Sequence, residues 1–347
     1  MKTKVVIQMT LKRKIIIVVA LALTVAVLVL VAHFMPNIKM TLAAKGYTVE
    51  EIDLSVHGDR IYFLNTGGAD AILIESEGKF ALIDGAEDSD NPRGFPELVY
   101  DGTEDYVVDA VRKIAGDENG KAVLEFILGT HSHSDHIGGL DTVILDENIT
   151  VKTAYIKKYD ASKIRQYEID AWDNQEVFDQ MISACEKKNV PVVHDISEEP
   201  FTFGNFTMKF CNTAETDISE PVGENENAVG LLIEKDGVRA FLAADINNLD
   251  GDEDRLAKEL GKINLLKVGH HGYDKSTTLD FVKSLNPEIA VVTNKKGKIS
   301  RTPLKNLNSV KAAIFETGKF EGVVAEFTNG GIVLYKDIDK NLSDSAE

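Results

Sequence analysis

Residues 130–139 most strongly constrain the fold of this chain, because three histidines and an aspartate lie there directly after an apolar segment. The segment Leu124 to Leu128 predicts a buried strand. It is followed by Thr130-His131-Ser132-His133-Ser134-Asp135-His136-Ile137-Gly138-Gly139. Alternate side chains of an extended chain point the same way, so His131 and His133 should share one side. A tight turn and a helix start would bring Asp135 and His136 to a neighbouring position.

This spacing predicts a site for two adjacent metal ions. Imidazole nitrogen and carboxylate oxygen suit Zn²⁺, and Mn²⁺ or iron accept the same donors. The alternative is a polar loop with incidental histidines, which four ligand-type residues so close together disfavour. One loop cannot complete two metal sites, so other strand ends must supply further ligands.

Two later apolar segments also end in ligand-type residues. Asp245 follows residues 240–244, where a buried carboxylate is costly unless a metal or a hydrogen bond balances it; a helix cap or turn aspartate is the alternative. His270 and His271 follow a third strand-like segment. One of them could bind metal and the other substrate, or each could be a hydrogen-bonded core histidine.

Other polar residues have weaker claims to a role. Asp84 follows the apolar residues 80–83 and could orient a ligand histidine from behind, or only begin a turn. Three further histidines lack ligand-type neighbours and are interpreted as incidental: His33, His57 and His194. Cys185 and Cys211 form no CxxC pair, and we expect two buried small side chains rather than a disulfide.

The order of elements predicts a mixed α/β (α+β) fold. Each half opens with short apolar hairpins and then alternates strands with amphipathic helices, such as the helix predicted over 169–185. The ligand-type residues all lie just past strand ends. We therefore expect two β-rich layers with helices outside and the site along one sheet edge.

An apolar run near the start predicts a membrane anchor. Residues 15–32 contain only one polar side chain, Thr24, and a basic stretch precedes them. Such a helix would span about 27 Å at 1.5 Å per residue, and the basic flank would remain in the cytoplasm. A cleaved signal peptide is the alternative. Both readings place the catalytic body outside the cytoplasm.

The predicted organisation has five parts, listed by residue number: a basic flank (1–14), the transmembrane anchor or uncleaved signal (15–34), a connector (35–57), the catalytic domain (58–336) and an acidic tail (337–347). The formal net charge is −18. Such a body repels polyanions at long range, so nucleic acid is not expected as a partner.

The run THSHSDHIGG resembles the HxHxDH signature of the metallo-β-lactamase superfamily. The runs LIDGAED, LAADIN and LKVGHHG resemble its other strand-end motifs, in the expected order. Two branches are most similar. One is the bacterial phosphorylcholine esterase, which acts on cell-wall teichoic acids and shares GGADAILIESEGKFALIDGAED. The other is the extracytoplasmic domain of competence DNA channels, which shares Asn227 and the HHG element.

The resemblance implies a four-layer αββα sandwich and a role for each ligand-type residue. His131 and His133 would bind the first metal, and the second would be bound by Asp135, His136 and His271. Asp245 would bridge both ions, and His270 would contact substrate. The superfamily's additional histidine between the first loop and the bridging aspartate is absent, and Asn227 lies in that neighbourhood, which disfavours β-lactam hydrolysis.

The resemblance implies a di-zinc hydrolase that acts on phosphodiesters of the cell wall or on small phosphoesters. The alternatives are a competence-type nuclease and a non-catalytic surface-binding domain. A hydroxide shared by two Zn²⁺ ions would attack phosphorus, and Asp135 or Asp245 would orient it. Tyr159 or Trp172 could face a quaternary ammonium group through a cation–π contact, although core packing is the commoner role of such a tryptophan.

Overall fold

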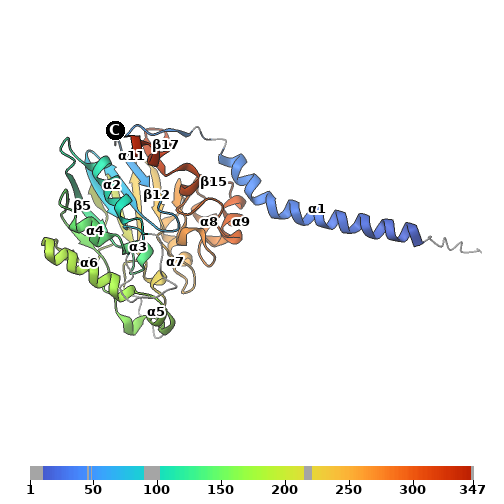
Figure 1. Ribbon diagram of the computed structural model, residues 1–347, viewed down its shortest axis with the longest axis horizontal. Helices are drawn as coiled ribbons and strands as arrows, with labels where there is room; N and C mark the ends of the chain where they lie inside the picture. The colour runs from blue at the N-terminus through green and yellow to red at the C-terminus, as the bar shows by residue number, and fades with distance from the viewer. Residues whose placement is uncertain (1–10, 45–46, 48, 90–101, 215–220, 345–347) are drawn as a thin grey trace, which may run out of the picture.

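The computed structural model describes residues 11–44, 47, 49–89, 102–214 and 221–344. Two β-sheets pack face to face in this part of the chain, and helices cover both outer faces (Figure 1). The predicted α/β sandwich is therefore confirmed. The predicted division of the chain at residues 58 and 336 remains a prediction.

The first sheet contains strands from both ends of the described chain. In spatial order its strands are β1 (Val49–Glu51), β17 (Gly331–Lys336), β16 (Val323–Thr328), β2 (Arg60–Phe63), β3 (Ile72–Ser76), β4 (Lys79–Ile83), β5 (Ala122–Leu128), β7 (Ala154–Tyr155) and β8 (Val192–Val193), and β6 (Ile149–Val151) also pairs with β5. The strand β4 runs antiparallel to β3 and parallel to β5, so the start of β3 meets the ends of β4 and β5 at one edge.

In the second sheet, too, several strand ends lie along one edge. Its order is β15 (Ala313–Glu316), β14 (Ile289–Val292), β13 (Leu265–Lys267), β12 (Val238–Leu242), β11 (Gly230–Lys235), β10 (Phe206–Cys211) and β9 (Phe201–Phe203). The strands β12, β13, β14 and β15 are parallel neighbours, so their carboxyl ends lie along one edge. Short loops at such an edge are the usual location of a functional site in α/β folds.

The helices follow the predicted alternation. They are α2 (Glu104–Ala115), α3 (Ser134–Ile137), α4 (Leu140–Leu145), α5 (Gln166–Ala171), α6 (Asn174–Lys188), α7 (Asp252–Leu260), α8 (Leu279–Leu285), α9 (Arg301–Ser309), α10 (Thr317–Phe320) and α11 (Ile338–Asp344), with 3₁₀ turns at Ala161–Lys163, Glu224–Asn227 and Gly269–Gly272. Helices α2, α4 and α6 cover the first sheet, whereas α7, α8 and α9 cover the second.

Three apolar clusters hold these layers together. Along β3, Ile72 and Ile74 face the second sheet, while Leu73 faces the helices on the other side. Both faces are covered, so the strand is apolar throughout rather than alternating with polar residues. The two cysteines are buried and unpaired, as predicted.

The N-terminal helix α1 (Leu11–Ala44) projects from the body (Figure 1), and its described apolar side chains, such as Leu21 and Leu28, are exposed. A helix that crosses a bilayer needs about 20 consecutive apolar residues. Within the part of the chain whose side chains are described, no helix is long and apolar enough to do so. The predicted transmembrane anchor at 15–34 and the single-pass location that depended on it are therefore wrong on this finding.

Candidate metal centre

The residues of the predicted site come from four strand ends and meet at one edge of the sandwich. Asp84 follows β4, and the run from His131 to His136 follows β5 in the first sheet. Asp245 follows β12, and His271 follows β13 in the second. Apart from Asp135, whose side chain is 32% exposed, all of these predicted residues are buried. Strand ends far apart in sequence thus converge on one buried cluster.

The first group of ligand atoms consists of His131, His133 and Asp245, whose donor atoms all lie within 4.8 Å of one another. The Nε2 atom of His131 lies 3.1 Å from Nδ1 of His133. On the other side of the His133 ring, Nε2 lies 3.5 Å from a carboxylate oxygen of Glu168 and has no hydrogen-bond partner. Glu168 is thus placed to orient the His133 ring from behind.

The second group contains His136, His271 and Asp245. The Nε2 atoms of the two histidines face each other at 3.1 Å, and Oδ1 of Asp245 lies 3.2 Å and 3.4 Å from them. Oδ2 of Asp135 lies 3.4 Å from Nε2 of His271. Asp245 therefore touches both groups, which is the geometry expected of a bridging carboxylate.

Asp70 also belongs to the second group by distance, although its place in the sequence did not predict a role. It reaches the histidines from the opposite side, because its carboxylate lies 3.3 Å from Nδ1 of His271 and 3.8 Å from Nδ1 of His136. The same carboxylate accepts a hydrogen bond from Thr293 and pairs with the buried Lys267. Asp70 is therefore better placed to orient the histidines than to share a cation with Asp135. The signal that could have found it is an acid between the turn Gly67-Gly68 and the apolar strand β3.

Asp84 has the same orienting geometry at His136. Its Oδ2 accepts a hydrogen bond from Nδ1 of His136 at 2.7 Å, and Thr130 donates its backbone N–H and its hydroxyl, both at 2.8 Å. Burial raises the pKa of Asp84, while the neighbouring His136 lowers it. Because every neighbour donates, the carboxylate acts as an acceptor and directs Nε2 of His136 towards Asp245.

The electrostatics of the cluster fit a cation. Burial alone would raise the pKa of Asp245, but His271 and His136 hold it well below its usual range, so this carboxylate is ionised. Its Oδ1 is nevertheless buried without a hydrogen-bond partner. An ionised oxygen without a donor, beside two ring nitrogens at close range, is costly in a protein interior. A divalent cation at this position would remove that cost, so the residues present fit a metal ion.

His270 lies at the rim of the cluster. Its ring is 27% exposed, and Nε2 lies 3.8 Å from Asp245 and 3.3 Å from the amide nitrogen of Asn225. Both His270 and His271 have φ near +49°, in the left-handed region that costs energy for residues other than glycine. The strain turns His271 inward and leaves His270 at the surface of the site. The predicted substrate contact of His270 remains a prediction.

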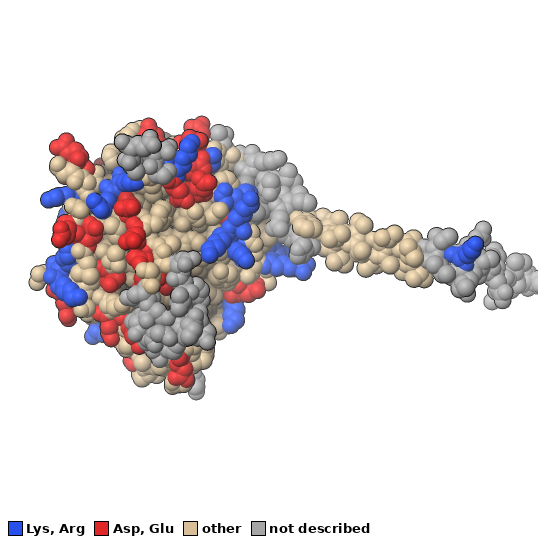
Figure 2. All heavy atoms as spheres, in the orientation of Figure 1, with Lys and Arg blue, Asp and Glu red and all other residues tan. Residues whose placement is uncertain are grey.

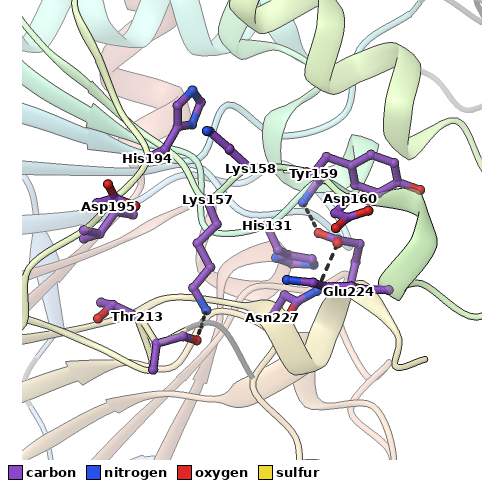
Figure 3. A pocket seen from close by; sticks show the side chains of 14 residues that line it. His131, Lys157, Lys158, Tyr159, Asp160, His194, Asp195, Thr213, Glu224 and Asn227 are labelled. Carbon is purple, nitrogen blue, oxygen red and sulfur yellow. Dashed lines mark hydrogen bonds between the residues drawn. The ribbon is translucent and has the colours of Figure 1, made fainter. Parts of the chain in front are cut away.

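The remaining predicted residues surround the first group. The Trp172 ring, at the end of α5, packs edge-on against His133 with centroids 4.5 Å apart, so it borders the site rather than a helix core. Asn227 donates to Glu224 at 3.2 Å and, with Tyr159 and His131, lines a cavity beside the cluster (Figure 3). Their roles towards substrate remain predictions.

The comparisons with known proteins concern the fold. A family model described as "Beta-lactamase superfamily domain" matches residues 106–293, which is more than half of the chain. No curated protein matches.

Several solved structures are similar to the chain. The metallo-beta-lactamase fold protein YhfI from Bacillus subtilis has 12% identity and a TM-score of 0.45, with 74% of this chain and 95% of that one covered. A new diphosphatase from the PhnP family has 14% identity and a TM-score of 0.42, with 76% and 84% covered. CmlA beta-hydroxylase has 12% identity and a TM-score of 0.43, with 74% of this chain covered, and the chain spans only 52% of that protein's length.

Proposed function

The chain belongs to the metallo-β-lactamase superfamily, and from this membership and its buried histidine–aspartate cluster we propose that it is a metal-dependent hydrolase of phosphoric esters, with diesters as its favoured substrates. One observation carries the proposal. The Asp245 carboxylate is shared by two groups of ligand atoms, so the cluster offers adjacent positions for two cations rather than one. Pairs of cations suit the displacement of an alkoxide from phosphorus, where charge develops on both the attacking and the leaving oxygen.

The geometry of the two groups supports one assignment of the residues that would hold the cations. His131 and His133 would hold the first, His136, His271 and Asp135 the second, and Asp245 both. Two bound divalent cations supply Lewis acidity and lower the pKa of coordinated water from about 15.7 towards 7. Zn²⁺ suits this mixed nitrogen and oxygen donor set, which Mn²⁺ and iron also accept.

The chain's own groups would prepare the reaction. Asp245 is ionised and Asp135 is the more exposed of the two acids, so either can orient an attacking nucleophile by accepting its proton in a hydrogen bond. His270 lies at the rim, where its ring N–H can donate to a non-bridging phosphoryl oxygen as negative charge develops. Asp84, Asp70 and Glu168 fix the ring orientations of the ligand histidines.

The first group also favours phosphoesters over β-lactams. It contains two histidines and a bridging aspartate, and the 3₁₀ turn Glu224–Asn227 supplies amides and glutamates near it instead of a third histidine. The carboxylate of Glu224 accepts the backbone N–H of Ser132 at 2.9 Å and so supports the histidine loop. A first position with fewer nitrogen ligands leaves more room for substrate oxygens to bind there.

Turnover by the zinc-loaded full chain tests the proposal. Four substrates separate the candidate functions: bis-p-nitrophenyl phosphate, p-nitrophenyl phosphorylcholine, single-stranded DNA and nitrocefin. We expect hydrolysis of the first or the second, two zinc ions per chain by elemental analysis, and no turnover of nitrocefin.

A pair of histidine variants supplies the control. His133→Ala should abolish turnover and lower the zinc content. His57→Ala should change neither, because the His57 side chain is 61% exposed and pairs with Glu75 away from the cluster. Full activity in His133→Ala, or less than one zinc per chain in the wild type, would contradict the proposed function.

A further inference from the structure

A cavity of about 570 Å³ borders the residues proposed to hold the first cation. His131 and Ser132 form part of its wall, and so do Glu224 and Asn227 from the 3₁₀ turn (Figure 3). A substrate whose phosphorus lies at the cations would extend one arm into this space. The side chains of the opposite wall therefore determine which chemical groups that arm of the substrate can carry.

Lysines dominate the segment that follows β7. Lys157, Lys158 and Lys163 all line the cavity, in a chain whose net charge is −18. Lys157 is the most enclosed of the three, and in Figure 3 its amino group is directed towards the chain near Thr213. It donates to the carbonyl oxygens of Asn212 at 2.7 Å and Ala214 at 3.2 Å.

An ammonium group has three N–H donors, and these two carbonyl groups occupy two of them. Main-chain carbonyls hold the Lys157 amino group in place but do not neutralise its charge. Burial lowers the pKa of Lys157 to about 8, so it is still mainly protonated at pH 7. A fixed cation with one donor to spare is suited to an anionic oxygen.

Two of the cavity's carboxylates have other partners. Asp160 accepts the backbone N–H of Ser162 at 3.0 Å and its hydroxyl at 2.6 Å, which caps the following turn. Glu224 accepts hydrogen bonds from Ser132 and Asn227, and burial raises its pKa. Asp195 is exposed at the wall. With three lysines and three carboxylates in its wall, the cavity is less acidic than the chain as a whole, whose net charge is −18. On the visible face of the molecule acidic and basic side chains are interspersed (Figure 2).

We propose that this cavity binds a second phosphate group of the substrate, with Lys157 as its principal contact and Lys158 and Lys163 as supporting charges. The inference rests on the proposed function. The second phosphate would not react: one diester bond is broken at the cations, and the second group holds the substrate in register. Lysine binds phosphate as a point charge.

A matched pair of chromogenic esters tests this inference with the zinc-loaded full chain. Thymidine 5′-(p-nitrophenyl phosphate) and the same compound with a 3′-phosphate share the reacting diester and the leaving group, and differ only in the second phosphate. We expect kcat/KM to be at least about tenfold higher for the 3′-phosphorylated ester, mainly through a lower KM. The preference should weaken as ionic strength rises.

Three variants locate the effect. Lys157→Met should remove most of the preference, and Lys158→Met, at an exposed position where folding is not at risk, should reduce it about threefold. Lys152→Met is the matched control: this lysine lies just before β7 but pairs with Glu125 at 2.6 Å on the surface, and its loss should leave the preference intact.

The outcomes separate the two proposals. Turnover of both esters with equal kcat/KM in the wild type, or an unchanged preference in both Lys157→Met and Lys158→Met, would overturn the second-phosphate site and leave the hydrolase assignment standing. Absence of turnover with either ester and with bis-p-nitrophenyl phosphate would refute the proposed function, and the inference with it. Thermal unfolding of each variant shows whether a lost preference comes from a lost fold.

Discussion

Replacing Asp84 by asparagine should weaken binding of the second cation without removing any of its ligands. The wild-type carboxylate accepts three hydrogen bonds, one from Nδ1 of His136 and two from Thr130. An amide of the same shape has one oxygen and one NH₂ group. Its NH₂ group must therefore face a donor, either the ring N–H of His136 or the groups of Thr130.

The expected size of the effect follows from the bond that is lost. A hydrogen bond to a charged group contributes about 1.5–3 kcal/mol, and about 1.4 kcal/mol corresponds to a tenfold change in affinity. The loss at His136 thus predicts roughly 10- to 100-fold weaker binding at the second position. This agrees with the range of about 10- to 100-fold for outer carboxylates that orient metal-binding histidines.

Titration of the metal-free protein with Zn²⁺ against a chromophoric chelator measures this affinity directly. Asp59→Asn is the matched control, because Asp59 is also a buried carboxylate with several donors, Ser76, Asn205 and Lys235. It precedes β2, at the edge of the first sheet opposite Asp84. If the Asp84→Asn variant bound both ions with affinities within twofold of the wild type, the orienting role would be refuted. An equal loss in Asp59→Asn would point to general destabilisation.

Three further predictions follow from the same geometry. Asp245→Asn should lower the zinc content below one ion per chain and abolish turnover, because both ligand groups lose a member; elemental analysis measures this. Glu168→Gln should weaken binding at His133 and leave the second position unchanged in the chelator titration. In the metal-free protein burial raises the pKa of Glu87 from 4.5 to about 9, so the folded state retains a proton that the unfolded state loses. Its contribution to stability is present below pH 4.5 and lost as pH rises towards 9, and Glu87→Gln should flatten this decline in urea unfolding.

The sequence identifies the strand-end ligands because their signal is local. His131, His133 and His136 lie in one loop, and Asp245 and His271 each follow a short apolar run, so spacing and position suffice. The sandwich follows from the same reasoning, since strands that are apolar on both faces need a layer on each side.

The residues that support the ligands carry no such signal. Glu168 lies on a short helix, and its proximity to His133 depends on how α5 packs. Lys157 follows a two-residue strand and gains its burial from a loop that begins 55 residues later, at Asn212. Trp172 shows the same limit, because helical spacing suggested core packing and the tertiary fold places its ring against His133. Contacts between elements decide these cases, and periodicity does not encode them.

A buried lysine, Lys267, lies beneath the centre and offsets part of the acidic charge of the cluster. Asp70, Asp84, Asp135 and Asp245 surround the second position, and Lys267 pairs with Asp70 and lies 3.9 Å from Asp245. In the metal-free protein burial alone would lower the pKa values of His136 and His271, but Asp245 and the neighbouring carboxylates raise both, that of His271 to about 9, so both rings hold a proton at pH 7. Two imidazolium ions, one ammonium and four carboxylates then give a net charge of −1, and without Lys267 it would be −2, so Lys267 limits the repulsion in the metal-free protein. With two divalent cations bound and the rings neutral, the net charge becomes +1. The loaded centre then has the sign that attracts an anionic phosphodiester, which neutral or zwitterionic substrates would not exploit to the same extent.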